Sequence, residues 1–175
     1  DIWHQKVITQ LHDKGADLVL NINASPFHLN KIQERKKLIS GHASKFSMPI
    51  VYANQVGGQD ELVFDGTSMA MDSKGKQVLQ LAKFEEDQAV VSFLSQHDGN
   101  ILSDKNEVIP ADSELEEVYR ALVLGAKDYI NKNKFPGVLI GSSGGIDSAL
   151  TAVIAADAIG SENVRSFMMP FKFTS

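Results

Sequence analysis

The sequence predicts a mixed α/β and α+β protein built from two parts. Residues 4–54 alternate helical and strand patterns, and residues 62–93 change to short strands and tight turns, an order typical of a two-layer α+β structure. From residue 113 a long helical pattern leads to an apolar strand, a glycine-rich turn and a second helix, which indicates the start of a parallel sheet. We therefore expect one part at 1–94 and another at 113–175, joined by a polar, aperiodic linker at 95–112.

Composition favours a soluble globular protein. Of the 175 residues, 43% are hydrophobic and 22% charged, and the net charge is −5. The basic residues form no long run, which gives a nucleic-acid partner little support. No apolar stretch approaches the roughly 20 residues of a membrane span, and no apolar run near the N-terminus indicates a signal peptide. The absence of cysteine excludes disulfides and fits a cytoplasmic protein.

The first part begins with two helix–strand pairs. Periodic apolar residues predict helices at 4–14 and about 29–46, and apolar runs predict strands at 16–23 and 50–53. Gly57-Gly58 is predicted as a turn. Strands at 62–64 and 68–71 are expected to form a hairpin-like unit, and further strands are expected at 78–81 and 89–93.

The second part opens on a capping box. Ser113 precedes an acidic first turn that includes Glu116, the arrangement in which each side chain satisfies a backbone N–H at a helix start. The apolar residues that follow at helical spacing predict a helix that packs along one face. An apolar strand at 138–140 precedes the glycine-rich turn, a helix follows the turn, and a second strand is expected at 164–170.

The glycine-rich turn carries the clearest chemistry. Two adjacent glycines at 144–145 let the backbone approach an anion and turn its N–H groups inward. Ser143 and Ser148 add neutral donors. Asp147 would repel phosphate unless a divalent cation lay between them, so the turn is predicted to bind Mg²⁺-polyphosphate. The kinase and GTPase P-loop is excluded because it needs a lysine after the second glycine. The simpler alternative is a turn that merely joins strand to helix.

The run Ser-Gly-Gly-x-Asp-Ser resembles the signature of the N-type ATP pyrophosphatases. Residues 141–151, with Met168-Met169-Pro170, are similar to the family of glutamine-dependent NAD⁺ synthetases, as are residues 1–3, 21–27 and 55–66 in the first part. The resemblance covers nearly the whole chain. It implies the C-terminal part of a nitrilase-like αββα glutaminase domain, followed by the start of a Rossmann-like domain of the adenine nucleotide α-hydrolase type.

The resemblance also implies site residues. Those expected to bind ATP and pyrophosphate are Gly141, Ser142, Ser143, Gly144, Gly145, Ile146, Asp147 and Ser148. Asp147 is the expected Mg²⁺ ligand, and Met168 and Met169 are placed to lie beside adenine or simply within a buried strand. Ser25 and Lys31 match the family positions that hold glutamine; without the resemblance, a turn serine and a solvated lysine would be the simpler interpretation.

The implied activity is ATP-dependent amidation of deamido-NAD⁺ (nicotinate adenine dinucleotide) to NAD⁺ through an acyl-adenylate, with ammonia from glutamine. ATP and Mg²⁺ are the implied cofactors, and a homo-oligomer is the implied assembly. The glutaminase Cys, Glu and Lys would all precede Asp1, so the isolated chain is expected to be inactive. Ser142 also stands where the family commonly has leucine. Two alternatives stay open: another N-type amidotransferase of the GMP synthetase kind, and a non-catalytic nucleotide-binding module.

Overall fold

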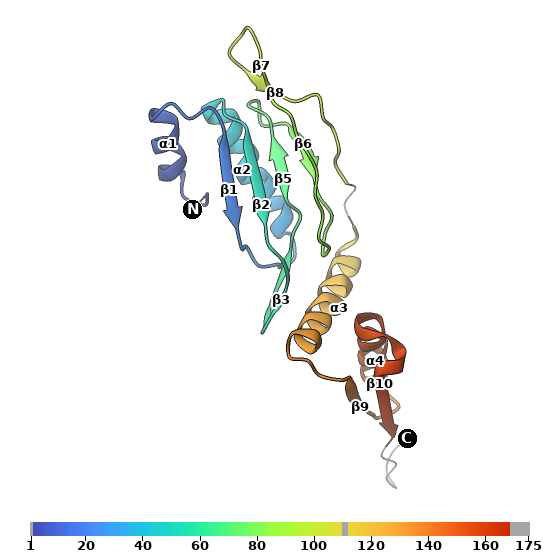
Figure 1. Ribbon diagram of the computed structural model, residues 1–175. Helices are drawn as coiled ribbons and strands as arrows, with labels where there is room; N and C mark the ends of the chain where they lie inside the picture. The colour runs from blue at the N-terminus through green and yellow to red at the C-terminus, as the bar shows by residue number, and fades with distance from the viewer. Residues whose placement is uncertain (1, 110–111, 169–175) are drawn as a thin grey trace. The chain divides into compact units, whose positions relative to one another are not determined.

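A computed structural model describes residues 2–109 and 112–168 (Figure 1). The chain divides into two compact units. Unit 1 comprises Asp1–Val56 and Phe64–Asp112, and unit 2 comprises Gly57–Val63 and Ser113–Ser175. Within the described ranges, no helix combines the length and the apolar character needed to cross a membrane.

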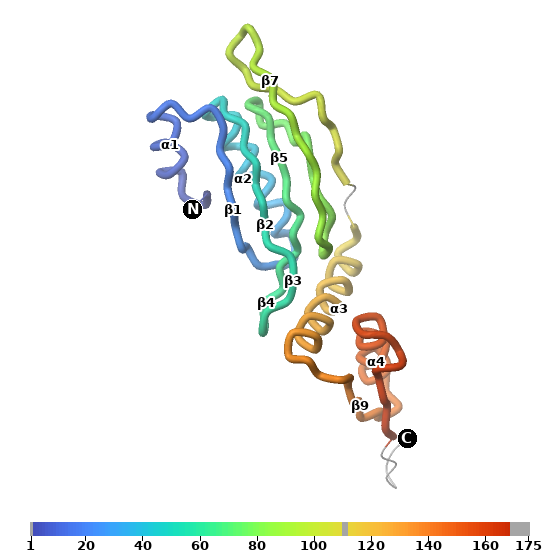
Figure 2. The backbone as a smooth tube through the Cα atoms, in the orientation of Figure 1, coloured from blue at the N-terminus to red at the C-terminus, as the bar shows by residue number. Residues whose placement is uncertain are grey.

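Unit 1 is built on a four-stranded mixed sheet with the strand order β1–β2–β5–β6. These strands are β1 (Val19–Asn23), β2 (Ile50–Asn54), β5 (Met69–Met71) and β6 (Gln77–Gln80). β1 and β2 run parallel, whereas the β2–β5 and β5–β6 pairs are antiparallel. Helices α1 (Gln5–Asp13) and α2 (Lys31–Phe46) accompany the sheet, and Figure 2 shows α2 lying across one face of it.

The main core of unit 1 lies between the helices and this face of the sheet. α1 contributes Ile8, and α2 contributes Ile39 and Ala43, which are fully buried. The strands contribute alternate residues, as a sheet with one covered face requires; they are Val19, Ile50, Tyr52, Met69 and Met71. The predicted helices at 4–14 and 29–46 and strands at 16–23 and 50–53 thus correspond to α1, α2, β1 and β2.

A smaller cluster covers part of the opposite face. Its buried members are Ala70, Val78 and Leu79, and the partly buried Val91 and Phe93 pack against it. The prediction of a strand at 89–93 is wrong, because these residues do not pair with any strand. The apolar side chains of Val91 and Phe93 pack on this cluster without strand pairing.

The segment predicted as a linker has regular structure in unit 1. β7 (Leu94–Ser95) pairs antiparallel with β8 (Ile101–Leu102). Further along, Glu107 extends the ladder of β6, since its N–H donates to the Val78 carbonyl at 3.0 Å and its carbonyl accepts from Gln80 N–H at 2.8 Å. The polar composition of residues 95–109 therefore marks an exposed edge of the sheet rather than a free connection.

A hairpin joins the two units in sequence. β3 (Val56–Gln59) pairs with β4 (Leu62–Asp65). The predicted turn at Gly57-Gly58 is wrong, and so is the predicted pairing of residues 62–64 with 68–71. The two glycines lie within β3, where a Cβ on Gly58 would come within 3.0 Å of the Cα of Gly125. Their small size serves close backbone packing within unit 2, not a turn.

In its described residues, which end at Met168, unit 2 has two α-helices and a two-stranded parallel sheet. Its further elements are α3 (Glu114–Lys132), β9 (Val138–Ser142), α4 (Ile146–Ile159), a 3₁₀ turn η1 (Ser161–Asn163) and β10 (Val164–Met168). The structure contains the serine half of the predicted capping box, because the Ser113 hydroxyl oxygen accepts a hydrogen bond from Glu116 N–H at 3.2 Å. The Tyr119 hydroxyl donates to Asp157 at 2.5 Å and ties α3 to α4.

Candidate functional site

The glycine-rich turn lies at the carboxyl end of β9 and leads directly into α4. Gly141 and Ser142 end the strand, and α4 begins at Ile146 with Gly145 as its N-cap. Glycine has no side chain, and Gly145 makes no side-chain cap hydrogen bond. The first N–H groups of a helix have no partner within the helix. This end of α4 therefore offers backbone donors and the positive end of a helix dipole to an anion.

The two serine hydroxyls converge on the same turn. The Oγ atoms of Ser143 and Ser148 lie 3.3 Å apart, and Ser143 Oγ accepts from Gly145 N–H at 3.3 Å. The Ser148 hydroxyl donates to the Gly145 carbonyl at 2.9 Å. Several of these contacts are at the long end of hydrogen-bond distances, so a phosphate oxygen could replace them at little cost. The sequence placed both hydroxyls in this cradle, and the structure brings them together.

The remaining loop residues are open to solvent. Gly144 has a φ of +83°, and nothing lies within 4 Å of the position that a Cβ would take. Asp147 is exposed in the first turn of α4, and Ile146 is 80% exposed. Met168, at the end of β10, is 66% exposed rather than buried in a strand, whereas the predicted Met169 lies outside the described residues. The described residues include no group of three His, Cys, Asp or Glu able to hold a metal ion.

The second candidate site lies in unit 1, in the loop between β1 and α2. Ser25 is buried, and its N–H donates to Asn54 Oδ1 at 2.8 Å. Lys31 opens α2; its Nζ donates to Glu34 at 3.0 Å and lies 4.1 Å from the centre of the Trp3 ring. The hydrogen bond from Lys31 is the main reason that the pKa of Glu34 is lowered from its usual value.

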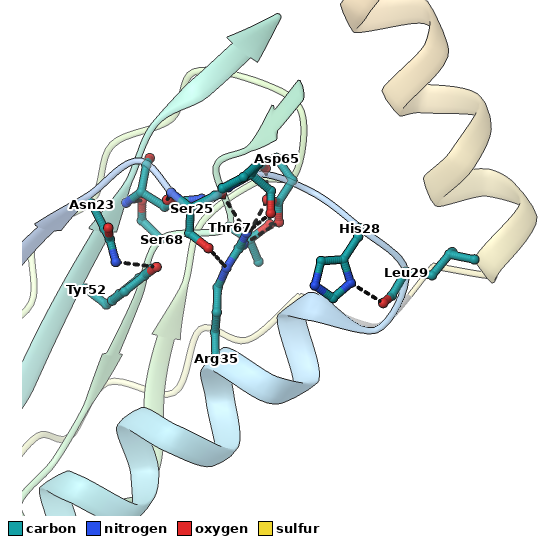
Figure 3. A network of polar contacts seen from close by, with 11 residues as sticks. Asn23, Ser25, His28, Leu29, Arg35, Tyr52, Asp65, Thr67 and Ser68 are labelled. Atoms are coloured by element: carbon teal, nitrogen blue, oxygen red, sulfur yellow. Dashed lines mark hydrogen bonds and ion pairs between the residues drawn. The ribbon is translucent and has the colours of Figure 1, made fainter. Parts of the chain in front are cut away.

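Figure 3 shows a buried polar network around Ser25. The Arg35 guanidinium donates from Nε to Ser25 Oγ at 3.1 Å, and from Nη2 to the carbonyl oxygens of Ser25 and Pro26 at 2.7 and 3.1 Å. Its Nη1 donates to both carboxylate oxygens of Asp65 at 2.8 Å. The side chains of Arg35 and Asp65 are both completely buried.

Tyr52 borders the same network. Its hydroxyl oxygen accepts from Asn23 Nδ2 at 3.0 Å. Burial raises the pKa of Tyr52 above its usual value, against the opposing effect of the Arg35 guanidinium and of hydrogen bonds with Ser25 and Asn23. Tyr52 therefore stays neutral at physiological pH.

Sequence reasoning missed Arg35 and Asp65. A signal existed, because Arg35 lies three residues after Ile32 and four before Ile39, on the buried face of α2. A charged residue on an apolar stripe needs a partner inside the protein. The identity of that partner, 30 residues away, is set by the folded chain.

Two family models match successive parts of the chain. Residues 1–97, more than half of the chain, match the carbon–nitrogen hydrolase family model. The chain belongs to the carbon–nitrogen hydrolase family. Residues 118–175 match the NAD synthase family model. The predicted fold class, a nitrilase-like region followed by an NAD synthase region, is confirmed.

Individual relatives are similar to this chain over its full length or nearly so. The chain is 42% identical to the glutamine-dependent NAD(+) synthetase of Synechocystis sp., over 99% of this chain and 32% of that protein. The corresponding enzyme of Aquifex aeolicus is 37% identical, over 100% and 36%. The structure of the glutamine-dependent NAD⁺ synthetase of Acinetobacter baumannii with ADP is 44% identical, with a TM-score of 0.91 over 100% of this chain and 33% of that one. The chain thus spans about a third of the length of these relatives.

Proposed function

We propose that the protein carrying this chain makes NAD⁺ by amidating deamido-NAD⁺ with ATP, using ammonia released from glutamine. The observation that carries the proposal is the combination on one chain of a carbon–nitrogen hydrolase region and an NAD synthase region that contains the glycine-rich turn. The first region suits hydrolysis of the glutamine amide. The second suits activation of a carboxylate by ATP. Cytoplasmic location and assembly into a homo-oligomer belong to the same proposal.

In unit 2 the turn at 141–148 would hold the pyrophosphate portion of ATP. The amide groups at the start of α4 and the hydroxyls of Ser143 and Ser148 supply donors to phosphate oxygens. Such donors stabilise the charge that develops on the leaving pyrophosphate when the substrate carboxylate attacks the α-phosphorus. An amide group then forms when ammonia attacks the acyl-adenylate and AMP leaves. Met168 would contact adenine.

The donor set of this turn fits Mg²⁺ that is bound chiefly through phosphate. Mg²⁺ usually binds to one or two protein carboxylates, together with water and substrate phosphates. Asp147 is an exposed carboxylate beside the anion-binding helix end, and in our proposal it is the protein ligand. When bound, Mg²⁺ neutralises charge on the departing pyrophosphate.

In unit 1 the loop between β1 and α2 would recognise glutamine. Lys31 and Glu34 place a cation and an anion 3.0 Å apart, the two charges that the α-carboxylate and α-ammonium groups of an amino acid require. Ser25 adds a hydroxyl held in a fixed position by Arg35. Amide hydrolysis by a thiolate needs a cysteine, and the chain contains none. The isolated chain is therefore expected to release no glutamate from glutamine.

The test supplies the complete protein that contains this chain with ATP, Mg²⁺ and glutamine, and offers deamido-NAD⁺ or xanthylate as the acceptor. We expect NAD⁺, AMP, pyrophosphate and glutamate from deamido-NAD⁺ alone. Amidation of xanthylate instead would identify an amidotransferase of the GMP synthetase kind. ATP binding without turnover of either acceptor would identify a non-catalytic nucleotide-binding module.

A further inference from the structure

We propose that the buried Arg35–Asp65 pair is a positioning device that sets the shape of the Ser25–Pro26 segment for recognition of an amino-acid amide. The inference rests on the proposed function, in which Ser25 contacts glutamine. Arg35 and Asp65 do not themselves contact the substrate. They act through the loop that Arg35 holds.

The geometry of Arg35 supports this role. A guanidinium group has five N–H donors and no acceptor. Three hydrogen bonds from Arg35 go to Ser25 Oγ, Ser25 O and Pro26 O, and two go to Asp65. The side chain thus meets the loop at one hydroxyl and two consecutive carbonyl oxygens (Figure 3). Three contacts on adjacent residues fix both the path of the backbone and the rotamer of Ser25.

Asp65, the other member of the pair, is also held in a fixed position by a hydrogen bond. Asp65 Oδ2 accepts from the Thr67 hydroxyl at 3.0 Å, and Thr67 is completely buried. Thr67 has a φ of +53°, a left-handed conformation that is unfavourable for a β-branched residue. Local strain of this kind persists only where the surrounding structure requires it, and it gathers at functional sites. Here the strained residue places its hydroxyl on the carboxylate that orients Arg35.

Stability alone does not account for a buried ion pair. The cost of removing both charges from water offsets much of their attraction, and well-packed apolar side chains of similar volume often serve as well or better. A positioning role requires what apolar side chains lack, namely donors aimed at the loop carbonyls. The two explanations therefore predict different outcomes when the pair is replaced by apolar residues.

The consequence for Ser25 is chemical. Its Oγ accepts from Arg35 Nε, and a guanidinium has no acceptor to offer in return. The proton of the Ser25 hydroxyl then points away from Arg35, on the side where Ser25 also forms a hydrogen bond with Tyr52. Arg35 thereby makes Ser25 a donor, and in our proposal the carboxylate or amide oxygen of glutamine replaces Tyr52 as its acceptor.

The test uses the complete protein and measures NAD⁺ formation with glutamine or with ammonia as the nitrogen source. The decisive variant is Arg35→Met with Asp65→Leu, which removes both charges together. We expect its KM for glutamine to rise by about tenfold or more, the effect of losing hydrogen bonds to a charged group. Its kinetics with ammonia should not change, because ammonia bypasses the glutamine loop.

The matched control is Lys83→Met with Asp112→Leu. It removes another ion pair of unit 1, in which the side chain of Lys83 is 3% exposed. We expect it to leave the KM for glutamine unchanged. If the Arg35 double variant does not fold, Arg35→Lys gives the answer by the same measurement, because lysine keeps the charge but cannot reach Ser25 Oγ and both carbonyl oxygens at once.

Three outcomes would overturn the inference. The first is an unchanged KM for glutamine in a folded Arg35→Met, Asp65→Leu variant. The second is an equal loss of activity with glutamine and with ammonia, which would mark a purely structural role. The third is a control variant that raises the KM for glutamine as much as the Arg35 double variant does. Wild-type protein that makes NAD⁺ from neither source would instead refute the proposed function, and the inference would fall with it.

Discussion

The substitution Gly58→Ala is expected to destabilise unit 2 selectively. In β3, the N–H of Gly58 donates to Asp128 Oδ2 at 2.7 Å, and its carbonyl accepts from Lys132. A Cβ at this position would lie 3.0 Å from the Cα of Gly125 and 3.3 Å from its carbonyl oxygen. Both are backbone atoms of α3, so the clash cannot be relieved by rotating a side chain. The hairpin would have to move away from the helix.

The size of the effect follows from this geometry. Overpacking of a well-packed contact costs about 1–3 kcal/mol, and each kcal/mol lowers the melting temperature of a unit of this size by about 4–8 °C. Gly125→Ala is the matched control. Its Cβ would meet Val63 Cγ2 at 3.1 Å, the end of a side chain that can shift, and alanine favours a helix over glycine by about 1 kcal/mol. We expect the control to be neutral or stabilising.

Hydrogen exchange resolves the two units, since peptides from α3 report on unit 2 and peptides from β2 on unit 1. Gly58→Ala should lower the free energy of opening in α3 and leave β2 as it is in the wild type. Unchanged protection of α3, or equal losses in the two alanine variants, would show that the reasoning about the close contact is wrong.

Three further predictions concern the candidate sites. Asp147→Asn should reduce kcat for NAD⁺ formation roughly 100-fold or more, and Ser148→Ala only about two- to tenfold; equal effects would contradict the metal role of the carboxylate. Gly144→Ala should raise the KM for ATP, because a φ of +83° is unfavourable for alanine and strains the turn, and because the methyl group takes space that a phosphate needs. Lys31→Met should raise the KM for glutamine in steady-state assays. By NMR titration it should also return the lowered pKa of Glu34 toward its usual value; the ion pair is formed above the unfolded-state pKa and is lost as the pH falls through the folded-state pKa.

Local interactions made part of this fold predictable. The capping box at Ser113 and Glu116 lies within one turn, and the structure contains the expected hydrogen bond. The strand, glycine turn and helix at 138–159 were also visible, because the apolar run, the glycines and the helical spacing are contiguous in sequence. Such features depend on neighbouring residues, so sequence alone specifies them.

Non-local contacts explain the errors. Gly57 and Gly58 were predicted as a turn because the sequence does not show that α3, nearly 70 residues later, needs close approach to their backbone. The predicted pairing of residues 62–64 with 68–71 was wrong for a similar reason. Asp65, at the end of β4, is held by Arg35 on α2, and Thr67 takes a left-handed conformation that carries the chain away from a simple hairpin. The place of the glycine-rich turn between β9 and α4 was predictable, whereas the contacts that hold Ser25 required the folded chain.

The fate of the carboxylate oxygen tests the account most directly. The complete protein is given deamido-NAD⁺ labelled with ¹⁸O in its nicotinate carboxylate, with ATP, Mg²⁺ and glutamine, and the products are analysed by mass spectrometry. An acyl-adenylate requires that one labelled oxygen leave with AMP for each NAD⁺ formed, while pyrophosphate stays unlabelled. Label in inorganic phosphate, or AMP without label, would contradict the proposal that the turn at 141–148 holds pyrophosphate during adenylation.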